Sequence, residues 1–496
     1  YGMGERATRE IAARLASGTP ISEITDVKGT CFVGKNPGEC AYPMVEVPSF
    51  EEVRDDKRAY AQANMVEYNE HDPIVGKAIL QRHGDRLLIC NPPAMPLTTE
   101  ELDAVFELPY VREPHPMYDE MGGVPAIEEV RFSVIHNRGC FGACNFCSLA
   151  FHQGRIISSR SHESVIREVT ELTKHPGFKG YIHDVGGPTA NFRRPACKKQ
   201  MKAGLCKNRA CLSPTACPNL DADHTDYLML LRKLRSLPGI KKIFIRSGIR
   251  FDYMMKDPSG EFFAELVKHH VSGQLKVAPE HCVNGVLDEM GKPHIEVYEK
   301  FRQKYERLNQ KYGKEQYLVP YLMSSHPGCT LQDAVKLAEW LNKSGRQPEQ
   351  VQDFYPTPGT LSTCMYYTGL DPRTMKPVFV PTDAHHKAMQ RALMQWKRPE
   401  KRPLVKEALR EAHREDLIGY GKECLLRPDR PAWTGKPGAP AKGKNQGRSG
   451  KPPKREDQKL KQKGKRVEHN DPQPKRKAGW AKPKAKKNAR PGKGRK

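Results

Sequence analysis

The sequence contains no long apolar run. Across 496 residues, no segment approaches the roughly 20 consecutive apolar residues that a membrane-spanning helix needs, and no apolar segment behind a basic start resembles a secretion signal. We therefore expect a soluble cytoplasmic protein with no membrane partner.

Evenly spread pairs of cysteines, which are typical of disulfide-rich proteins, are also lacking. The 14 cysteines gather in clusters instead, and clustering favours metal ligation in a reducing compartment. A chain of this length is expected to fold as about two or three domains with a large apolar core.

Acidic residues are too few to balance the basic ones, but the imbalance is confined to one end of the chain. The formal net charge is +25. Residues 427–496 contribute 25 Lys plus Arg and 5 Asp plus Glu, a net of +20, which leaves +5 for the other 426 residues. Since the rest of the chain is nearly balanced, the composition does not indicate a basic active-site cleft.

The basic segment 427–496 is dominated by Lys, Arg, Pro and Gly, with Trp433 and Trp480 as its only large aromatic residues. Such a composition cannot bury enough apolar surface to fold, so we predict a disordered basic tail. Two roles are open for it. The tail either contacts the phosphates of RNA or ribosomes in a salt-sensitive way, or it only keeps the protein in solution.

Three cysteines lie within eight residues, at Cys140, Cys144 and Cys147, with Phe146 directly before the third. Thiolates so close together on a glycine-containing loop can converge on one face of a metal cluster, but three ligands do not complete a tetrahedral structural zinc site. An iron-sulfur cube with three protein ligands has one iron free for a non-protein partner, which predicts an enzyme.

The Cys-x3-Cys-x2-Cys spacing resembles the signature of radical S-adenosylmethionine (SAM) enzymes, and residues 130–160 resemble the YgiQ-type branch of that superfamily in particular. The resemblance covers about residues 127–365. It implies a 4Fe-4S cluster on the three cysteines, SAM bound to the open iron with Phe146 nearby, and reductive cleavage of SAM to methionine and a 5'-deoxyadenosyl radical. It also implies an electron donor such as flavodoxin or ferredoxin. It supplies no substrate. The alternative is a shared zinc site or a plain thiol loop.

From about residue 128, strand-like runs alternate with helix-like runs. Strands are predicted at 129–135, 179–185, 241–246, 273–278, 315–322 and 348–354, and helices at 162–175, 223–236, 258–270, 294–312, 330–343 and 382–397. Six strand-helix units indicate an α/β fold, an open six-stranded (β/α)6 partial TIM-like barrel, with a doubly wound sheet as the alternative.

Unusual residues follow each predicted strand, where the loops of a parallel sheet converge on one rim. Gly186 and Gly187 follow the second strand, and the resemblance implies that they contact the amino group of SAM. Arg246 and Ser247 follow the third strand and Glu280 the fourth; these polar groups suit the ribose, the carboxylate or the ammonium group of SAM. An internal ion pair for Arg246 and a solvated carboxylate for Glu280 are the alternatives. The rim also carries His183, His281 and His326, for substrate binding or for local hydrogen bonds.

A second group of cysteines interrupts the second unit, at Cys197, Cys206, Cys211 and Cys217. Four thiols within 21 residues predict a structural zinc site or an auxiliary iron-sulfur cluster, with uncoordinated thiols as the alternative. A long loop inside a compact domain usually has a purpose, such as covering the site.

The remaining boundaries divide the chain into an N-terminal region at 1–126, the radical SAM partial barrel at 127–400, a helical extension at 401–426 and the tail. A glycine turn at residues 2–5 precedes an amphipathic helix predicted at 7–15. This resembles the end of a Rossmann-like, cobalamin-binding-type domain, most of which the chain would lack; a plain glycine turn is the alternative, and cobalamin use stays open. Residues 20–126 show no fold of their own and are expected to be irregular.

Two hypotheses of function result. The first is a radical SAM enzyme of unknown substrate. The second is an iron-sulfur or zinc-containing protein that binds RNA or ribosomes through its basic tail.

Overall fold

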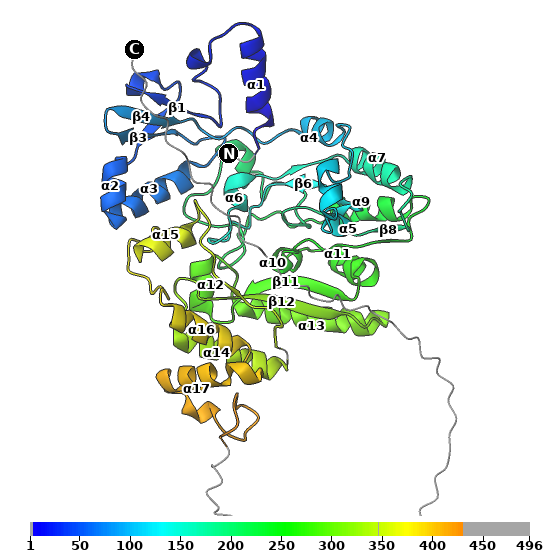
Figure 1. Cartoon of the computed structure of the whole chain (residues 1–496). Helices are drawn as coiled ribbons and strands as arrows, with labels where there is room; N and C mark the ends of the chain where they lie inside the picture. Colours follow the sequence, from blue (N-terminus) through cyan, green and yellow to red (C-terminus); the bar gives the residue numbers. More distant parts are fainter. Residues whose placement is uncertain (1–2, 346, 430–496) are drawn as a thin grey trace, which may run out of the picture. The chain divides into compact units, whose positions relative to one another are not determined.

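The structure is a computed structural model that describes residues 3–345 and 347–429 (Figure 1). Contacts divide the chain into two units, 1–430 and 431–496. The predicted tail lies outside the described residues except for 427–429, where the Asp429 carboxylate accepts hydrogen bonds from Arg402 at 2.8 Å and from Lys406. Within the described ranges, no helix combines the length and apolarity needed to cross a membrane.

A four-stranded sheet forms in the N-terminal region. Its order is β1 (Cys31–Gly34), β4 (Arg86–Cys90), β3 (Ala78–His83) and β2 (Met44–Glu46), antiparallel except for the parallel pair β2–β3. The prediction of an irregular region at 20–126 is therefore wrong. The strands are short, and β1 pairs with β4 across more than fifty intervening residues; the local signal is the β3–β4 hairpin with its Gly84-Asp85 turn, which the prediction missed.

Four α-helices lie in the part of the N-terminal region that the structure describes, and the second and third of them contact β3. The predicted helix at 7–15 is confirmed as α1 (Glu5–Ala16), and α2 (Phe50–Asp55), α3 (Lys57–Glu70) and α4 (Thr99–Phe106) follow. Side chains fix two of the starts: Ser49 with Glu52 and Thr98 with Glu101 form capping boxes that satisfy the first free backbone amides of α2 and α4.

The alternation of strands and helices is confirmed. The strands are β5 (Ser133–Ile135), β8 (Tyr181–Ile182) with β9 (Asp184–Gly186), β10 (Lys242–Ile243), β11 (Gln274–Glu280), β12 (Tyr317–Ser324) and β13 (Gln352–Asp353). The helices are α7 (His162–Thr173), α9 (Thr225–Arg235), α11 (Glu261–Glu265) with the π-helical η4 (Leu266–His270), α13 (Ile295–Tyr312), α14 (Leu331–Ser344) and α16 (Ala384–Met394). The first strand begins later than predicted, because residues 127–130 form the short helix α5 (Ile127–Val130).

Every pair between these strands is parallel, but the pairing is in three pieces. β5 pairs with β9, β8 with β10, and β11, β12 and β13 form a three-stranded sheet. Between β10 and β11, the Ile245 N–H donates to the His270 carbonyl at 3.1 Å, but the described residues form no strand pair there. The fold is thus mixed α/β without a closed barrel, and one continuous six-stranded sheet is not confirmed.

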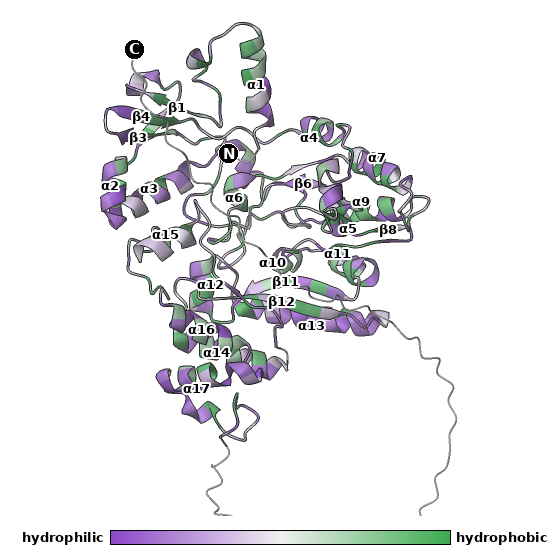
Figure 2. Cartoon of the chain, viewed as in Figure 1, coloured by the Kyte–Doolittle hydropathy of each residue, from purple (hydrophilic) through white to green (hydrophobic). Residues whose placement is uncertain are grey.

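One face of these strands packs on the helices, and the other is more open. On β11, Leu275 and Val277 are buried while Lys276 is exposed; on β12, Leu318 is buried while Tyr317 is exposed. The buried residues join apolar side chains of α7, α9 and α13 in the main core, and Figure 2 shows the corresponding apolar stripes on otherwise hydrophilic helices. Period-two alternation of this kind sets which residues can line a site.

A second core holds α14, α16 and α17 (Arg402–Glu411), which pack side by side at the yellow and orange end of Figure 1. Thr330 and Asp333 form a capping box at the start of α14, whose inner face buries Leu331, Ala334, Val335, Ala338 and Leu341. The extension predicted as one helix is α17 followed by the 3-10 turn η6 (Glu415–Leu417).

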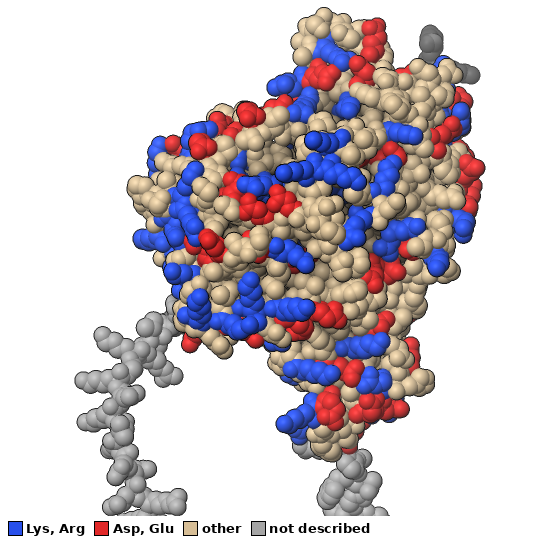
Figure 3. All heavy atoms as spheres, turned by 180° about the vertical axis from the view of Figure 1, so that it is seen from behind, with Lys and Arg blue, Asp and Glu red and all other residues tan. Residues whose placement is uncertain are grey.

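Short elements that no sequence pattern indicated complete the fold. They are β6 (Asn137–Arg138), β7 (Ser158–Ser159), α6 (Leu149–His152), α8 (Gln200–Ala203), α10 (Phe251–Met254), α12 (Asn284–Met290), α15 (Leu361–Thr368) and the 3-10 turns η1 (Ile21–Glu23), η2 (Pro37–Glu39), η3 (Pro116–Met121) and η5 (Pro399–Lys401). Figure 3 shows both signs of charge interspersed over one face, in line with the small net charge outside the tail.

Candidate cluster and cofactor site

The loop that carries Cys140, Cys144 and Cys147 is closed at its base by two short strands. β6 leads into the loop and pairs antiparallel with β7, which follows it. Gly139 stands at the junction with φ of +89°, and a Cβ there would lie 2.3 Å from the Ile156 carbonyl oxygen. Only glycine accommodates both this conformation and this approach.

Asn145, between the second and third cysteines, ties the loop to two other elements. Its backbone N–H donates to the Met290 carbonyl and its side-chain amide to the Glu289 carbonyl, both at 2.9 Å at the end of α12. Its own carbonyl accepts from the Ser362 N–H in α15, also at 2.9 Å. The loop is therefore positioned by helices that follow it by more than a hundred residues.

The three predicted ligands lie together. Burial raises the pKa of Cys140 and of Cys147, and the Cys144 thiol adds a smaller rise to each. Together these effects bring the pKa of Cys147 to about 12. The Sγ of Cys140 is 3.4 Å from Oγ1 of Thr189, just past the end of β9. The chain thus brings the cysteine loop against the loop that begins with Gly186 and Gly187.

Arg250 lies behind the loop and was not found from the sequence. Its Nη1 donates to the Sγ of Cys144 at 3.3 Å, and its other donors form a forked pair with the Asp252 carboxylate at 2.8 and 2.6 Å. A Cβ at Gly142 would lie 2.4 Å from the same Nη1, so this position has room only for glycine. In the sequence, Arg250 is one of several basic residues near the end of the third strand, and nothing marks it.

Two further charges face this centre. Burial raises the pKa of the Glu280 carboxyl, while the positive charges of Lys292 and Arg250 lower it. Lys292 also lowers the pKa of Cys147. Glu280 has φ of +68°, a conformation that is rare for a non-glycine residue, at a bulge in the pairing of β11 with β12. The charges of Arg250 and Lys292 therefore act both on Glu280 and on the cysteine loop.

A cavity of about 760 Å³ opens beside the carboxyl ends of β5 and β9. Its lining includes three of the predicted residues, Gly187, Arg246 and Ser247, together with Asn137 and Asp184. Asp184 was missed by the sequence reasoning. Its carboxylate accepts from the backbone N–H groups of Arg246 and Ser247, at 2.8 and 3.1 Å, and from the Ser247 hydroxyl.

Neighbouring side chains fill the space that the two glycines leave. A Cβ on Gly186 would lie 2.1 Å from the Ser247 Oγ, and one on Gly187 would lie 1.8 Å from the Asn137 Oδ1. That Oδ1 is buried and has no hydrogen-bond partner within the described chain. Because Gly186 and Gly187 lack side chains, Ser247 and Asn137 can lie directly against the backbone there.

The other predicted residues have local partners. Arg246 pairs with Glu129 at 3.1 Å, and both side chains are exposed. Phe146 packs with apolar residues of α12 and lies edge-on to His326. His326 bonds the Ser362 hydroxyl at 2.7 Å, and His281 accepts from the Val283 N–H at 3.1 Å. His183 lies between β8 and β9 against Phe132.

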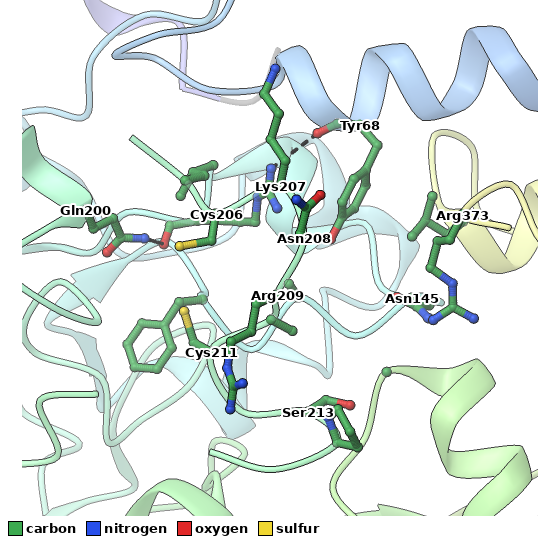
Figure 4. Close-up of a pocket in the computed structure, with 18 of the residues that line it drawn as sticks. Tyr68, Asn145, Gln200, Cys206, Lys207, Asn208, Arg209, Cys211, Ser213 and Arg373 are labelled. Atoms are coloured by element: carbon green, nitrogen blue, oxygen red, sulfur yellow. Dashed lines mark hydrogen bonds between the residues drawn. The ribbon is translucent and has the colours of Figure 1, made fainter. Parts of the chain in front are cut away.

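The second cysteine group lies next to the first loop. The pKa of Cys211 is raised to about 12, mainly by burial and to a smaller extent by the thiols of Cys197, Cys206 and Cys217. Three of the four line another cavity of about 760 Å³, whose lining also includes Phe141 of the first loop (Figure 4). Among the residues that the structure describes, no three His, Cys, Asp or Glu side chains form a group that could hold a single metal ion.

The cysteine loop at the end of the first of several parallel strands is the arrangement expected of a radical SAM protein, and comparison with known families agrees. Residues 1–133 match a family model described as "Radical SAM N-terminal", and residues 349–494 match a domain of unknown function, DUF3362.

Curated relatives identify the branch. The chain is 54% identical over 427 residues to a UPF0313 protein of Clostridium perfringens (strain 13 / Type A), covering 86% of this chain and 64% of the relative. It is 54% identical over 431 residues to a UPF0313 protein of Clostridium botulinum (strain ATCC 19397 / Type A), covering 87% and 67%. The chain therefore belongs to the UPF0313, or YgiQ, family of radical SAM proteins. It spans a little under two thirds of the length of the Clostridium perfringens relative.

Solved structures give a weaker likeness. The radical SAM methyltransferase TsrM from Kitasatospora setae, with tryptophan substrate and a SAM analog bound, aligns at 13% identity and a TM-score of 0.28 over 45% of this chain and 35% of that one. The same enzyme with cobalamin and a [4Fe-4S] cluster bound aligns at 11% identity and a TM-score of 0.28 over 57% and 60%. Because these TM-scores are low, the description of the fold relies on the strands and helices of this chain alone.

Proposed function

We propose that this chain is the core of a radical SAM enzyme, with Cys140, Cys144 and Cys147 as ligands of a 4Fe-4S cluster. SAM binds at the carboxyl ends of the strands, which make up an open six-stranded partial barrel. When bound, the cluster and SAM together supply reductive cleavage of SAM to methionine and a 5'-deoxyadenosyl radical, which acts on a substrate that has yet to be identified. The observation that carries the proposal is the gathering of three half-buried thiols on one loop, with the Cys140 sulfur against Thr189, which follows the Gly186–Gly187 pair.

The donor set suits a thiolate-bound cluster. Burial alone disfavours thiolates, as the raised pKa values of Cys140 and Cys147 show. Arg250 and Lys292 supply opposite charge, and Arg250 donates directly to the Cys144 sulfur. Positive charge and hydrogen bonding favour the thiolate form that iron requires. Three protein ligands also leave one iron for SAM.

The cavity beside β5 and β9 suits the polar part of SAM. The unpaired Oδ1 of Asn137 is an acceptor for an ammonium or hydroxyl group. Asp184 holds Ser247 and the backbone of Arg246 in place at the wall. Arg246 is exposed and paired only with an exposed glutamate, so it can exchange Glu129 for a carboxylate of the cofactor.

An external one-electron donor such as flavodoxin or ferredoxin completes the proposal, because reductive cleavage of SAM consumes one electron. The cluster loop would receive it. This partner is inferred from the chemistry of the reaction.

The test is formation of 5'-deoxyadenosine from SAM by anaerobically reconstituted protein with dithionite as reductant. We expect product from the parent chain and none from Cys144→Ala. Cys424→Ala is the matched control, since its thiol lies outside both cysteine groups and contacts the Asp416 carbonyl. The enzyme proposal fails if Cys144→Ala makes as much 5'-deoxyadenosine as the parent. It fails equally if a fully iron-loaded parent makes none.

A further inference from the structure

The segment that carries the second cysteine group is long and irregular, yet it is held at a fixed place. Residues 204–224 form neither helix nor strand. The Asp221 N–H donates to the Ala196 carbonyl at 2.8 Å and closes the base of the segment next to Cys197. The Leu205 N–H donates to Asp72 at 2.6 Å, and Lys207 pairs with Glu70 at 2.7 Å, which joins the segment to the end of α3.

Holding such a segment in one conformation is costly. Ordering a residue costs about 1–2 kcal/mol in backbone entropy, and irregular segments of this length inside a domain usually serve a function. The apolar contribution is small, because Leu212 and Ala222 are the buried apolar residues between 204 and 224. A cross-link through the four thiols would supply the missing stabilisation.

The thiols are placed to share one ligand. The Cys217 N–H donates to the Cys211 carbonyl at 2.9 Å, which brings the last two cysteines of the group together. Cys197, Cys206 and Cys211 line the cavity of about 760 Å³, and Figure 4 shows the sulfur atoms of Cys206 and Cys211 on the same side of it. Three of the four thiols therefore line one cavity, and the fourth, Cys217, is held next to Cys211 by the backbone.

The charges around this cavity favour an anionic ligand. Lys199, Lys207 and Arg209 line the same cavity, and Arg155 is close enough to lower the pKa of Cys211 against the effect of burial. A cube with four thiolate ligands carries net negative charge, which such cations offset.

We propose that Cys197, Cys206, Cys211 and Cys217 bind a second 4Fe-4S cluster. In a cube each of the four irons takes one thiolate, which suits sulfur atoms spread along a cavity wall. Zinc would require all four sulfur atoms at about 2.3 Å from one point. The site lies against the first one: Phe141 of the first loop and Ala196 pack in one apolar cluster that also contacts Cys140 and Cys211.

The first experiment measures metal in the full chain after anaerobic reconstitution with ferrous iron and sulfide. The triple variant Cys140→Ala/Cys144→Ala/Cys147→Ala should keep about four irons per chain, with the electron paramagnetic resonance signal of a reduced cube. Adding Cys206→Ala and Cys211→Ala should remove this iron, and adding Cys424→Ala should not. A triple variant without iron, or with one zinc per chain in its place, overturns the proposal.

The second experiment uses the unmutated chain and so does not depend on a variant folding. Cys206 is exposed, so iodoacetamide should label it quickly unless its sulfur is bound to iron. We expect labelling of Cys206 to be about tenfold slower in iron-loaded than in chelator-treated protein, and labelling of Cys424 to be equal in both. Equal labelling of Cys206 in the two states would refute the second cluster. Neither readout depends on SAM cleavage, so the two proposals can fail separately.

Discussion

Replacing Arg250 with Gln tests the placement of charge behind the cysteine loop. The Arg250 and Asp252 side chains are 9% and 5% exposed, and two hydrogen bonds join them. Removing one partner of a buried ion pair leaves the other charge without compensation and costs about 3–5 kcal/mol. We expect Arg250→Gln to lower the free energy of unfolding of the iron-free protein by about that amount in urea denaturation.

Two further variants separate this effect from a general loss of packing. In the double variant Arg250→Gln/Asp252→Asn, both charges are gone and no buried carboxylate is left without a partner, so at least half of the lost stability should return. Arg246→Gln is the matched control: its pair with Glu129 is 45% and 77% exposed, and its loss should cost less than about 1 kcal/mol. A loss below about 1 kcal/mol for Arg250→Gln, or no recovery in the double variant, would refute the reasoning.

Three other predictions concern single positions. Gly187→Ala places a Cβ 1.8 Å from the Asn137 Oδ1. Calorimetry should therefore show weaker SAM binding, and urea denaturation should show a free energy of unfolding lower by about 1–3 kcal/mol. Adding Asn137→Ala should restore part of this stability. Contact with His270, aided by the charge of Arg235, lowers the pKa of Glu265 to about 2. Because this pKa lies below the unfolded value, the stabilisation is present above about pH 4.5 and is lost as the pH falls towards 2. Glu265→Gln should therefore destabilise at pH 7 and converge with the parent in acid unfolding curves. Thr330→Ala removes the capping box of α14 and should cost about 1 kcal/mol, seen as a lower urea midpoint.

Local patterns in the sequence predicted the features that depend on neighbouring residues. The helix predicted at 330–343 is confirmed as α14, which a local capping box begins and a period-3.6 apolar face anchors. The alternation of strands and helices was also predicted from local patterns, because each strand or helix shows its own period of apolar residues. The cysteine spacing and Phe146 indicated the superfamily, which the UPF0313 relatives confirm.

Contacts between distant parts of the chain were beyond this kind of reading. In the N-terminal sheet, the pairs β1–β4 and β2–β3 were missed because each joins strands that are distant in sequence, whereas the β3–β4 hairpin was a local signal left unused. Asp184 and Arg250 carry no sequence signal, because what distinguishes them is what they touch: Ser247 in one case and the Cys144 sulfur in the other.

The sequence by itself therefore determined the alternating strands and helices from about residue 128 onward, the family and the three thiols. Only the tertiary structure decided which charges and hydrogen-bond donors surround those thiols, and it divided the predicted sheet into three paired pieces. It also brought the second cysteine group against the first through Phe141. The physical reason is the range of the interactions. Periodicity and capping act over a few residues, whereas burial, charge pairing and shared cavities depend on segments that meet only when the chain is folded.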